Sequence, residues 1–108
     1  LEALAAWKDI NKWMKHSGES VYDITGGGFP EKANQPVTLK GDNIMYLHAF
    51  PNWHKSLVVK EVLKRPMRTV LLRTGEEIRF EYKDNTLTVH IPPYKRTRQV
   101  DTVKVYLE

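Results

Sequence analysis

Two alternating runs on either side of Asp84-Asn85 place the strongest constraint on the fold of this chain. Within residues 78–82 and 87–91 every second residue is apolar, and the residues between them are polar or charged. Side chains of a β-strand point alternately to its two faces, so each run predicts a strand with one buried face. An Asp-Asn dipeptide between two such strands favours a tight turn, and the sequence therefore predicts a β-hairpin.

Other segments have the composition of strands and are separated by residues that favour turns. Gly41-Asp42, Pro66 and Pro92-Pro93 interrupt the pattern, so turn signals recur at roughly 8 to 12 residues. The segment 67–74 is the most continuously apolar, and we expect it to be a central strand. The further predicted strands are residues 37–40, 43–50, 56–62, 67–74 and 101–108.

Residues 2–16 have a different period, which is typical of an amphipathic helix. Their apolar side chains, Trp7, Trp13 and Met14 among them, fall on an arc of about 120° of a helical wheel. Gly18 gives a stop signal for this helix. No second helical pattern separates the strands, which disfavours a parallel βαβ fold. The sequence therefore predicts an antiparallel β-sandwich of about seven to eight strands preceded by one N-terminal α-helix, with a β-barrel as the alternative.

Composition excludes several classes of site. A chain of 108 residues is sufficient for one ordinary domain, and the absence of cysteine excludes disulfides, thiolate metal sites and cysteine nucleophiles. No apolar run approaches the roughly 20 residues of a membrane helix, so we expect no membrane partner. The chain begins at Leu1 with the helical pattern under way, which we interpret as a fragment of a longer polypeptide.

The net charge of +4 is mild, and one dense basic cluster stands out. It contains Lys95, Arg96 and Arg98, whereas the other basic residues alternate with acidic ones. Nucleic-acid binders usually concentrate positive charge and aromatic residues on one face. We therefore keep nucleic-acid binding only as a minor hypothesis and expect no nucleic-acid partner.

Two motifs between the helix and the first strands resemble a nucleophile elbow and a phosphate-binding loop, but neither has the complete pattern. Ser20 lies in GESVY, where a nucleophile elbow needs a second glycine in place of Tyr22. Gly26-Gly27-Gly28 leads into a proline and a polar stretch, whereas a phosphate loop leads into a helix. We interpret Ser20 as a connector residue and the glycines as a flexible surface loop.

Histidines and carboxylates give no catalytic or metal-binding set. His48 and His54 flank a short loop and could meet across it, but no histidine pair has the spacing of a zinc helix. Glu76 and Glu77 are neighbours in an extended segment, so they point to opposite faces and cannot flank one glycosidic bond. We predict no catalytic residue, no metal site and no cofactor in this chain.

Aromatic residues give two sets of candidate contacts. Trp53, His54 and Tyr94 lie in predicted loops, where they could contact a sugar, although Trp53 could instead pack over one end of the sandwich. Trp7, Trp13 and Met14 give the helix a larger apolar face than a lone small domain easily buries. We expect this face to pack against another domain or against the sandwich itself.

Four segments, in order, resemble the C-terminal region of α-L-fucosidases of glycoside hydrolase family 29. INKWMKHSGESVYDI (10–24) is similar to the family's junction IGxWLxxNGExIYxT between helix and sandwich. VTLKGDNIMYLHAF (37–50) resembles a strand pair of that domain, VLLRTGEEIRFEY (70–82) a later segment, and EIRFEYKDNTLTVHIPP (77–93) the closing hairpin. The resemblance is weakest over residues 92–108.

The resemblance implies a role without catalysis. In this family a preceding (β/α)8-like barrel carries the nucleophilic Asp and the acid/base carboxylate that remove terminal α-L-fucose with retention, and none of its motifs occurs here. Residues 1–24 would then be the last barrel-type helix and junction, and residues 25–108 the C-terminal β-sandwich domain. We expect an inactive fragment whose partner is the catalytic barrel of the same polypeptide, with fucosylated glycans as a further candidate partner. The family implies a secreted, periplasmic or lysosomal parent enzyme.

Overall fold

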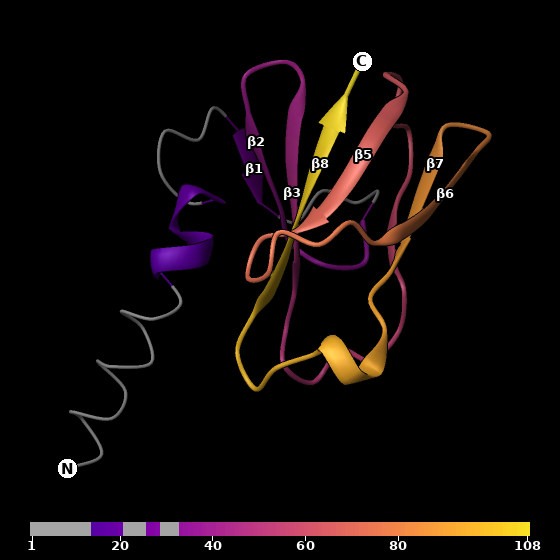
Figure 1. Cartoon of the computed structure of the whole chain (residues 1–108). Coiled ribbons are helices and arrows are strands. Elements are labelled where there is room, and N and C mark those ends of the chain that lie inside the picture. The colour runs from indigo at the N-terminus through magenta and orange to yellow at the C-terminus, as the bar shows by residue number, and fades with distance from the viewer. Residues whose placement is uncertain (1–13, 21–25, 29–32) are drawn as a thin grey trace, which may run out of the picture.

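The computed structural model describes residues 14–20, 26–28 and 33–108. Two antiparallel sheets make up this part of the chain (Figure 1), which confirms a mainly β fold with two packed sheets. The larger sheet has the order β1 (Gly26–Gly28), β2 (Val37–Lys40), β3 (Ile44–Ala49), β8 (Asp101–Leu107), β5 (Pro66–Leu71). The smaller sheet has the order β4 (Leu57–Val59), β7 (Thr86–His90), β6 (Arg79–Lys83).

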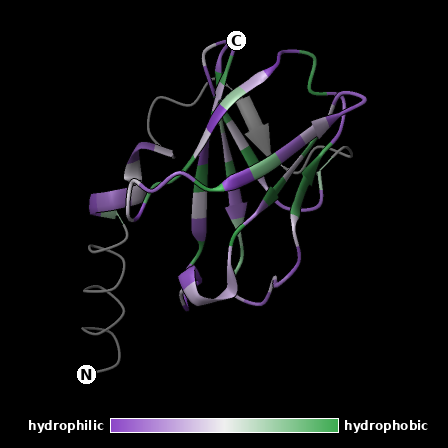
Figure 2. Ribbon diagram, turned by 45° about the vertical axis from the view of Figure 1, so that its right-hand side comes forward, coloured by the Kyte–Doolittle hydropathy of each residue, from purple (hydrophilic) through white to green (hydrophobic). Residues whose placement is uncertain are grey.

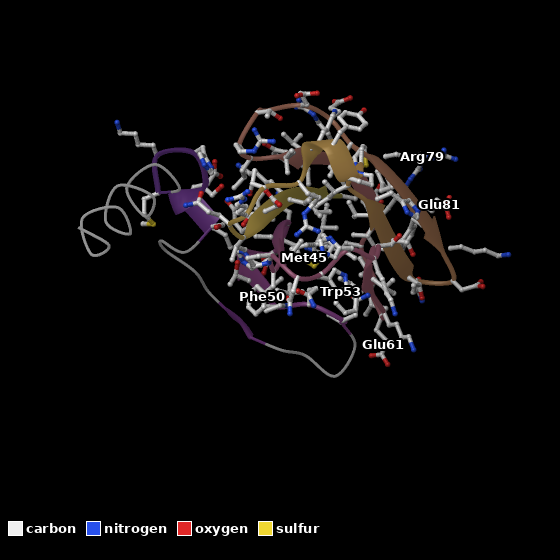
Figure 3. All side chains as sticks on the ribbon, turned by 90° about the horizontal axis from the view of Figure 1, so that it is seen from below. Met45, Phe50, Trp53, Glu61, Arg79 and Glu81 are labelled. Carbon is white, nitrogen blue, oxygen red and sulfur yellow. The ribbon has the colours of Figure 1, made fainter. Side chains whose placement is uncertain are left out.

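The core lies between the facing sides of the two sheets. Met45 of β3 and Val103 of β8 meet Leu87 and Val89 of β7 in one cluster of buried residues, and Met45 lies inside the molecule in Figure 3. Hydrophobic and hydrophilic residues alternate along several strands (Figure 2), as expected where one face of each sheet is buried. The alternation of hydrophobic and hydrophilic residues therefore determines which side chains of each strand face the core and which lie on the outer face of the sheet.

The predicted hairpin is confirmed. β6 pairs with β7 in the register Tyr82↔Leu87 and Lys83↔Thr86, with Asp84 and Asn85 between them. Asp84 has φ 52° and Asn85 has φ 61°. Positive φ at both central residues is the requirement of a type I′ turn, whose twist matches that of the two strands. Asn and Asp accept this conformation more readily than other residues with a Cβ.

The prediction that segment 67–74 is a central strand is wrong. β5 is the last strand of the larger sheet, because β8 lies between it and β3. Its free side is partly covered by the following loop, where Ile78 N–H donates to Thr69 O at 3.0 Å. Pro66, expected to break the chain, begins β5 just before an irregularity in the pairing, and proline is tolerated at such positions of edge strands.

The glycine triplet is a strand, so its interpretation as a flexible surface loop is wrong. Gly26–Gly28 form β1, which pairs with β2 through Gly27↔Thr38 and its neighbours. Backbone hydrogen bonds need no side chain, so an ordered neighbouring strand can hold three glycines that have little strand propensity of their own. β4 is also shorter than the predicted 56–62 and ends at Val59.

Only the end of the predicted helix lies within the described residues. Residues 14–17 are helical and continue into a 3-10 turn, η1 (Gly18–Ser20). Met14 is half-buried, whereas Trp7 and Trp13 lie outside the described residues. A second 3-10 turn, η2 (Pro93–Lys95), follows β7. Within the part of the chain that the structure describes, no helix is long and apolar enough to cross a membrane.

Candidate functional site

The outer face of the larger sheet is covered, which is unusual for the solvent side of a sandwich. Alternation points Tyr46, His48 and Thr102 away from the core, yet their side chains are 0%, 6% and 1% exposed. Outward residues of an antiparallel sheet normally face water. The helical segment 14–20 lies beside this sheet in Figure 1, and its contacts account for part of the cover.

Glu19 attaches this segment to two strands at once. Its Oε2 accepts hydrogen bonds from Tyr46 OH of β3 and from Lys104 Nζ of β8, both at 2.8 Å. The ammonium of Lys40 on β2 donates to Glu19 O at 2.8 Å. We refer to Glu19, Lys40, Tyr46 and Lys104 as the Glu19 cluster.

The interactions within the Glu19 cluster favour the charged forms of Glu19 and Lys104. Burial raises the pKa of the Glu19 carboxyl, but hydrogen bonds from Lys104 and Tyr46 outweigh burial and hold that pKa below its ordinary value. Burial lowers the pKa of Lys104, but the hydrogen bond to Glu19 together with the charges of Tyr46 and Glu19 outweighs burial, so this pKa is raised. Burial and the Glu19 carboxylate raise the pKa of Tyr46 to about 12. The phenol therefore remains a donor to the carboxylate at any physiological pH.

His48 joins two strands beneath the same segment. Its Nε2 lies 2.9 Å from Thr38 Oγ1, and its Nδ1 lies 3.0 Å from Thr102 Oγ1. The Thr38 hydroxyl donates its single proton to Ser20 O at 2.9 Å, so it must accept from His48. His48 is therefore the neutral Nε2–H tautomer, with Thr102 donating to Nδ1. Burial lowers the pKa of His48 to about 4.

Both ring nitrogens of His48 are thus occupied, which argues against a metal site shared with His54. His54 is an exposed loop residue. Among the residues that the structure describes, no group of three or more His, Cys, Asp or Glu is arranged to hold a metal ion.

Ser20, Glu76 and Glu77 all make structural contacts. The Ser20 side chain is fully buried, and its Oγ donates to Ser17 O at 2.6 Å. Glu76 pairs with Lys95 at 2.6 Å, whereas Glu77 pairs with Arg68 at 2.7 Å. The two carboxylates engage different partners, in agreement with the argument that they do not flank a common bond.

The basic cluster of the sequence is divided by the fold. The side chain of Arg96 is 10% exposed, and its Nε donates to Asp101 Oδ2 at 2.7 Å. The same guanidinium donates to the carbonyls of Phe50 and Trp53. Arg96 thus ties the loop after β3 to the loop before β8, a role that the sequence pattern did not reveal.

The three candidate sugar contacts lie near the same end of the sandwich. Trp53 is half-buried, packs against the core cluster and donates from Nε1 to Ser56 O at 3.3 Å. Tyr94 is 83% exposed in η2. His54 and Pro93, which precedes Tyr94, line the same two hollows. A sugar contact by Trp53, His54 and Tyr94 remains a prediction.

Comparisons with known proteins identify the fold. No protein-family model and no curated relative matches the sequence. Among solved structures, α-L-fucosidase isoenzyme 1 from Paenibacillus thiaminolyticus is 22% identical, with a TM-score of 0.78 over 98% of this chain and 27% of its own.

Two further structures are described as family GH29 α-L-fucosidases from Bacteroides thetaiotaomicron. One is 27% identical, with a TM-score of 0.73 over 92% of this chain and 23% of its own. The other is 25% identical, with a TM-score of 0.76 over 99% of this chain and 25% of its own. The chain spans about a quarter of the length of these proteins. The resemblance stated from the sequence is confirmed at this level: the chain has the fold of one part of α-L-fucosidases of glycoside hydrolase family 29.

Proposed function

We propose that this chain is a non-catalytic accessory domain at the C-terminal side of an α-L-fucosidase, a retaining exo-glycosidase that removes terminal α-L-fucose. The proposal rests on the covered outer face of the larger sheet, where Tyr46, His48 and Thr102 are buried and segment 14–20 bonds to Tyr46 and Thr38. The likeness to about a quarter of each solved fucosidase supports it. In this role the domain packs against a catalytic barrel of the same polypeptide.

The division of the chain follows from this proposal. Residues 1–24 are the last barrel-type helix and the junction, and residues 25–108 are the sandwich. Trp7, Trp13 and Met14 face the barrel. The Glu19 cluster attaches segment 14–20, at the junction, to three strands of the larger sheet.

A charge reversal tests this attachment. Glu19→Lys and Lys104→Glu should each weaken it, whereas the double variant should recover part of the loss, because the pair is restored with opposite sign. Calorimetry of the parent enzyme should then give two separated thermal transitions for each single variant and a more cooperative one for the double variant. Lys83→Glu, on the smaller sheet, is the matched control and should leave the transition unchanged. Equal effects of Lys83→Glu and Lys104→Glu would contradict the proposed attachment.

The exposure of Tyr94 supports a second candidate, a carbohydrate-binding module that uses loop aromatics. Its ring is 83% exposed, and Pro93, the residue before it, lines the hollow at His54, so the ring could stack on a sugar face. Titration of the chain with fucose and fucosylated glycans, followed by tryptophan fluorescence and calorimetry, tests this function. A flat response at millimolar sugar would eliminate it.

A further inference from the structure

Two neighbouring hollows lie at the end of the sandwich where β3 ends and β8 begins. Their volumes are about 420 and 310 Å³, within the roughly 300–1,000 Å³ of small-molecule sites. They border each other because His54, Ile91 and Pro93 line both. The first is also lined by Arg96, Thr97 and Arg98, and the second by Lys55, Ser56, Arg79, His90 and Pro92. We call the pair the basic cleft.

The fold gathers the basic side chains of this cleft from distant segments. Arg79 of β6 is paired with His90 of β7, so both lie on the outer face of the smaller sheet, and Arg79 extends outward in Figure 3. His90 Nδ1 lies 2.7 Å from Ser56 Oγ, which joins the loop before β4 to this face. No acidic residue is among the described residues that line the cleft.

Part of this positive charge is neutralised, and part is available. Arg96 is committed to Asp101, and Glu81 Oε1 lies 3.9 Å from His90 Nε2. Across residues 14–20, 26–28 and 33–108, no carboxylate forms an ion pair with Lys55, Arg79 or Arg98. Like charges held around a concave surface raise the local potential and attract anions.

We propose that the basic cleft binds a tetrahedral oxyanion, carried as a sulfate ester on a sugar. Arg79 and Arg98 supply forked N–H donors that match the geometry of such an anion. Ile91 and Pro93 line both hollows and would offer an apolar surface to the carbon face of the ring. The choice of a sugar rests on the proposed function, whereas the choice of an oxyanion rests on the cleft alone.

A nucleic acid fits the cleft less well. Phosphate-backbone binding needs a continuous run of free cations, and Lys95 and Arg96, which adjoin Arg98, are held by Glu76 and Asp101. The cleft instead has the size of a site for one or two sugar rings.

Titration at constant ionic strength tests the proposal. The intact chain is followed by NMR during addition of galactose 6-sulfate, galactose, sodium sulfate and a short oligonucleotide. Galactose 6-sulfate should shift the amide signals of residues 54–56, 90–91 and 96–98, whereas galactose should not. The Arg79→Gln, Arg98→Gln double variant should bind the sulfated sugar at least about tenfold more weakly, as expected for loss of charge-assisted hydrogen bonds.

The control variant is Lys83→Gln with Arg65→Gln, which removes the same charge from exposed residues outside the cleft and should change affinity less than about twofold. Equal losses of affinity in the cleft variant and the control variant would show that binding reflects the general positive charge of the protein, and would overturn the proposed site. Equal binding of galactose and its sulfate would overturn the oxyanion. Binding of sodium sulfate but not of the sulfated sugar would support an oxyanion site and overturn the sugar as its carrier. Tighter binding of the oligonucleotide in the same cleft would overturn both the oxyanion and the sugar as the ligand. None of these outcomes depends on fucosidase activity, so the proposed function is tested separately.

Discussion

At the scale of single residues, two buried polar groups connect segments that are distant in sequence. His48 is held between Thr38 and Thr102 on the outer face of the larger sheet, and Asp101 holds Arg96 at one end of the sandwich. Neither partnership follows from the local sequence. Arg96 lies in a run that resembles an exposed basic patch, and only the return of the chain at Asp101 buries it. Alternation along β3 points His48 away from the core, but no pattern in the sequence shows what covers that face.

The buried His48 should make the stability of the domain fall as the pH is lowered. The unfolded histidine has a pKa near 6.5, and burial lowers the folded value to about 4, so the unfolded chain binds more protons between these values. Stability is unaffected by His48 above pH 6.5, declines below it by about 2 kcal/mol at pH 5, and reaches its full loss of about 3 kcal/mol below pH 4. Urea unfolding from pH 7.5 to 4.5 measures this slope.

His48→Gln is the matched variant for this measurement, because it removes the titrating group and keeps a polar side chain. The difference in free energy of unfolding between wild type and variant should change with pH in this window. Parallel pH profiles for the two proteins would contradict the role of His48.

The buried ion pair should be among the most sensitive positions of the domain. Arg96→Met retains much of the side-chain volume but leaves the Asp101 carboxylate, which is 1% exposed, without its charge partner. Breaking one side of a buried pair typically destabilises by about 3–5 kcal/mol. The neighbouring variant Lys95→Met breaks a more exposed pair with Glu76 and should lower stability far less than Arg96→Met. Chemical denaturation that gives the same loss for both variants would contradict this ranking.

At the scale of elements, the sequence predicts where the strands lie in the chain better than it predicts which strands pair with each other. The hairpin of β6 and β7 is local, and its alternation and turn residues are sufficient to predict it. The position of β5 depends on β8, which comes more than 30 residues later and lies between β5 and β3. Strand order is therefore set by long-range pairing that no local pattern encodes. β1 was missed for a related reason, since three glycines form a strand only against the edge of β2.

The type I′ turn gives a test at this scale. Asn85→Ala should destabilise the domain by about 1 kcal/mol, because alanine is less tolerant than asparagine of φ 61°. Asn85→Gly removes the same side-chain amide but accepts positive φ, so its stability should remain within about 0.5 kcal/mol of wild type. Thermal unfolding of both variants measures the difference. If alanine and glycine gave the same loss, the amide contact with Tyr82 rather than the backbone would explain the effect.

At the scale of the whole molecule, the fold class could be predicted from the sequence, but the candidate surfaces could not. The covered face of the larger sheet brings residue 19 beside residues 46 and 104, and the basic cleft joins β6, β7 and three loops. Both surfaces arise from the packing of segments that are remote in the chain. The resemblance to family 29 fucosidases, by contrast, rests on short motifs in a fixed order and can be detected from the sequence alone.

Hydrolysis of 4-nitrophenyl α-L-fucoside tests the central claim most directly. The purified 108-residue chain should release no nitrophenol above the buffer rate at high protein concentration, because its described residues provide structural contacts in place of a paired acid and nucleophile. The parent polypeptide, assayed in parallel, should hydrolyse the same substrate with retention of configuration. Turnover by the chain alone, or a parent polypeptide without fucosidase activity, would contradict the assignment of an accessory domain.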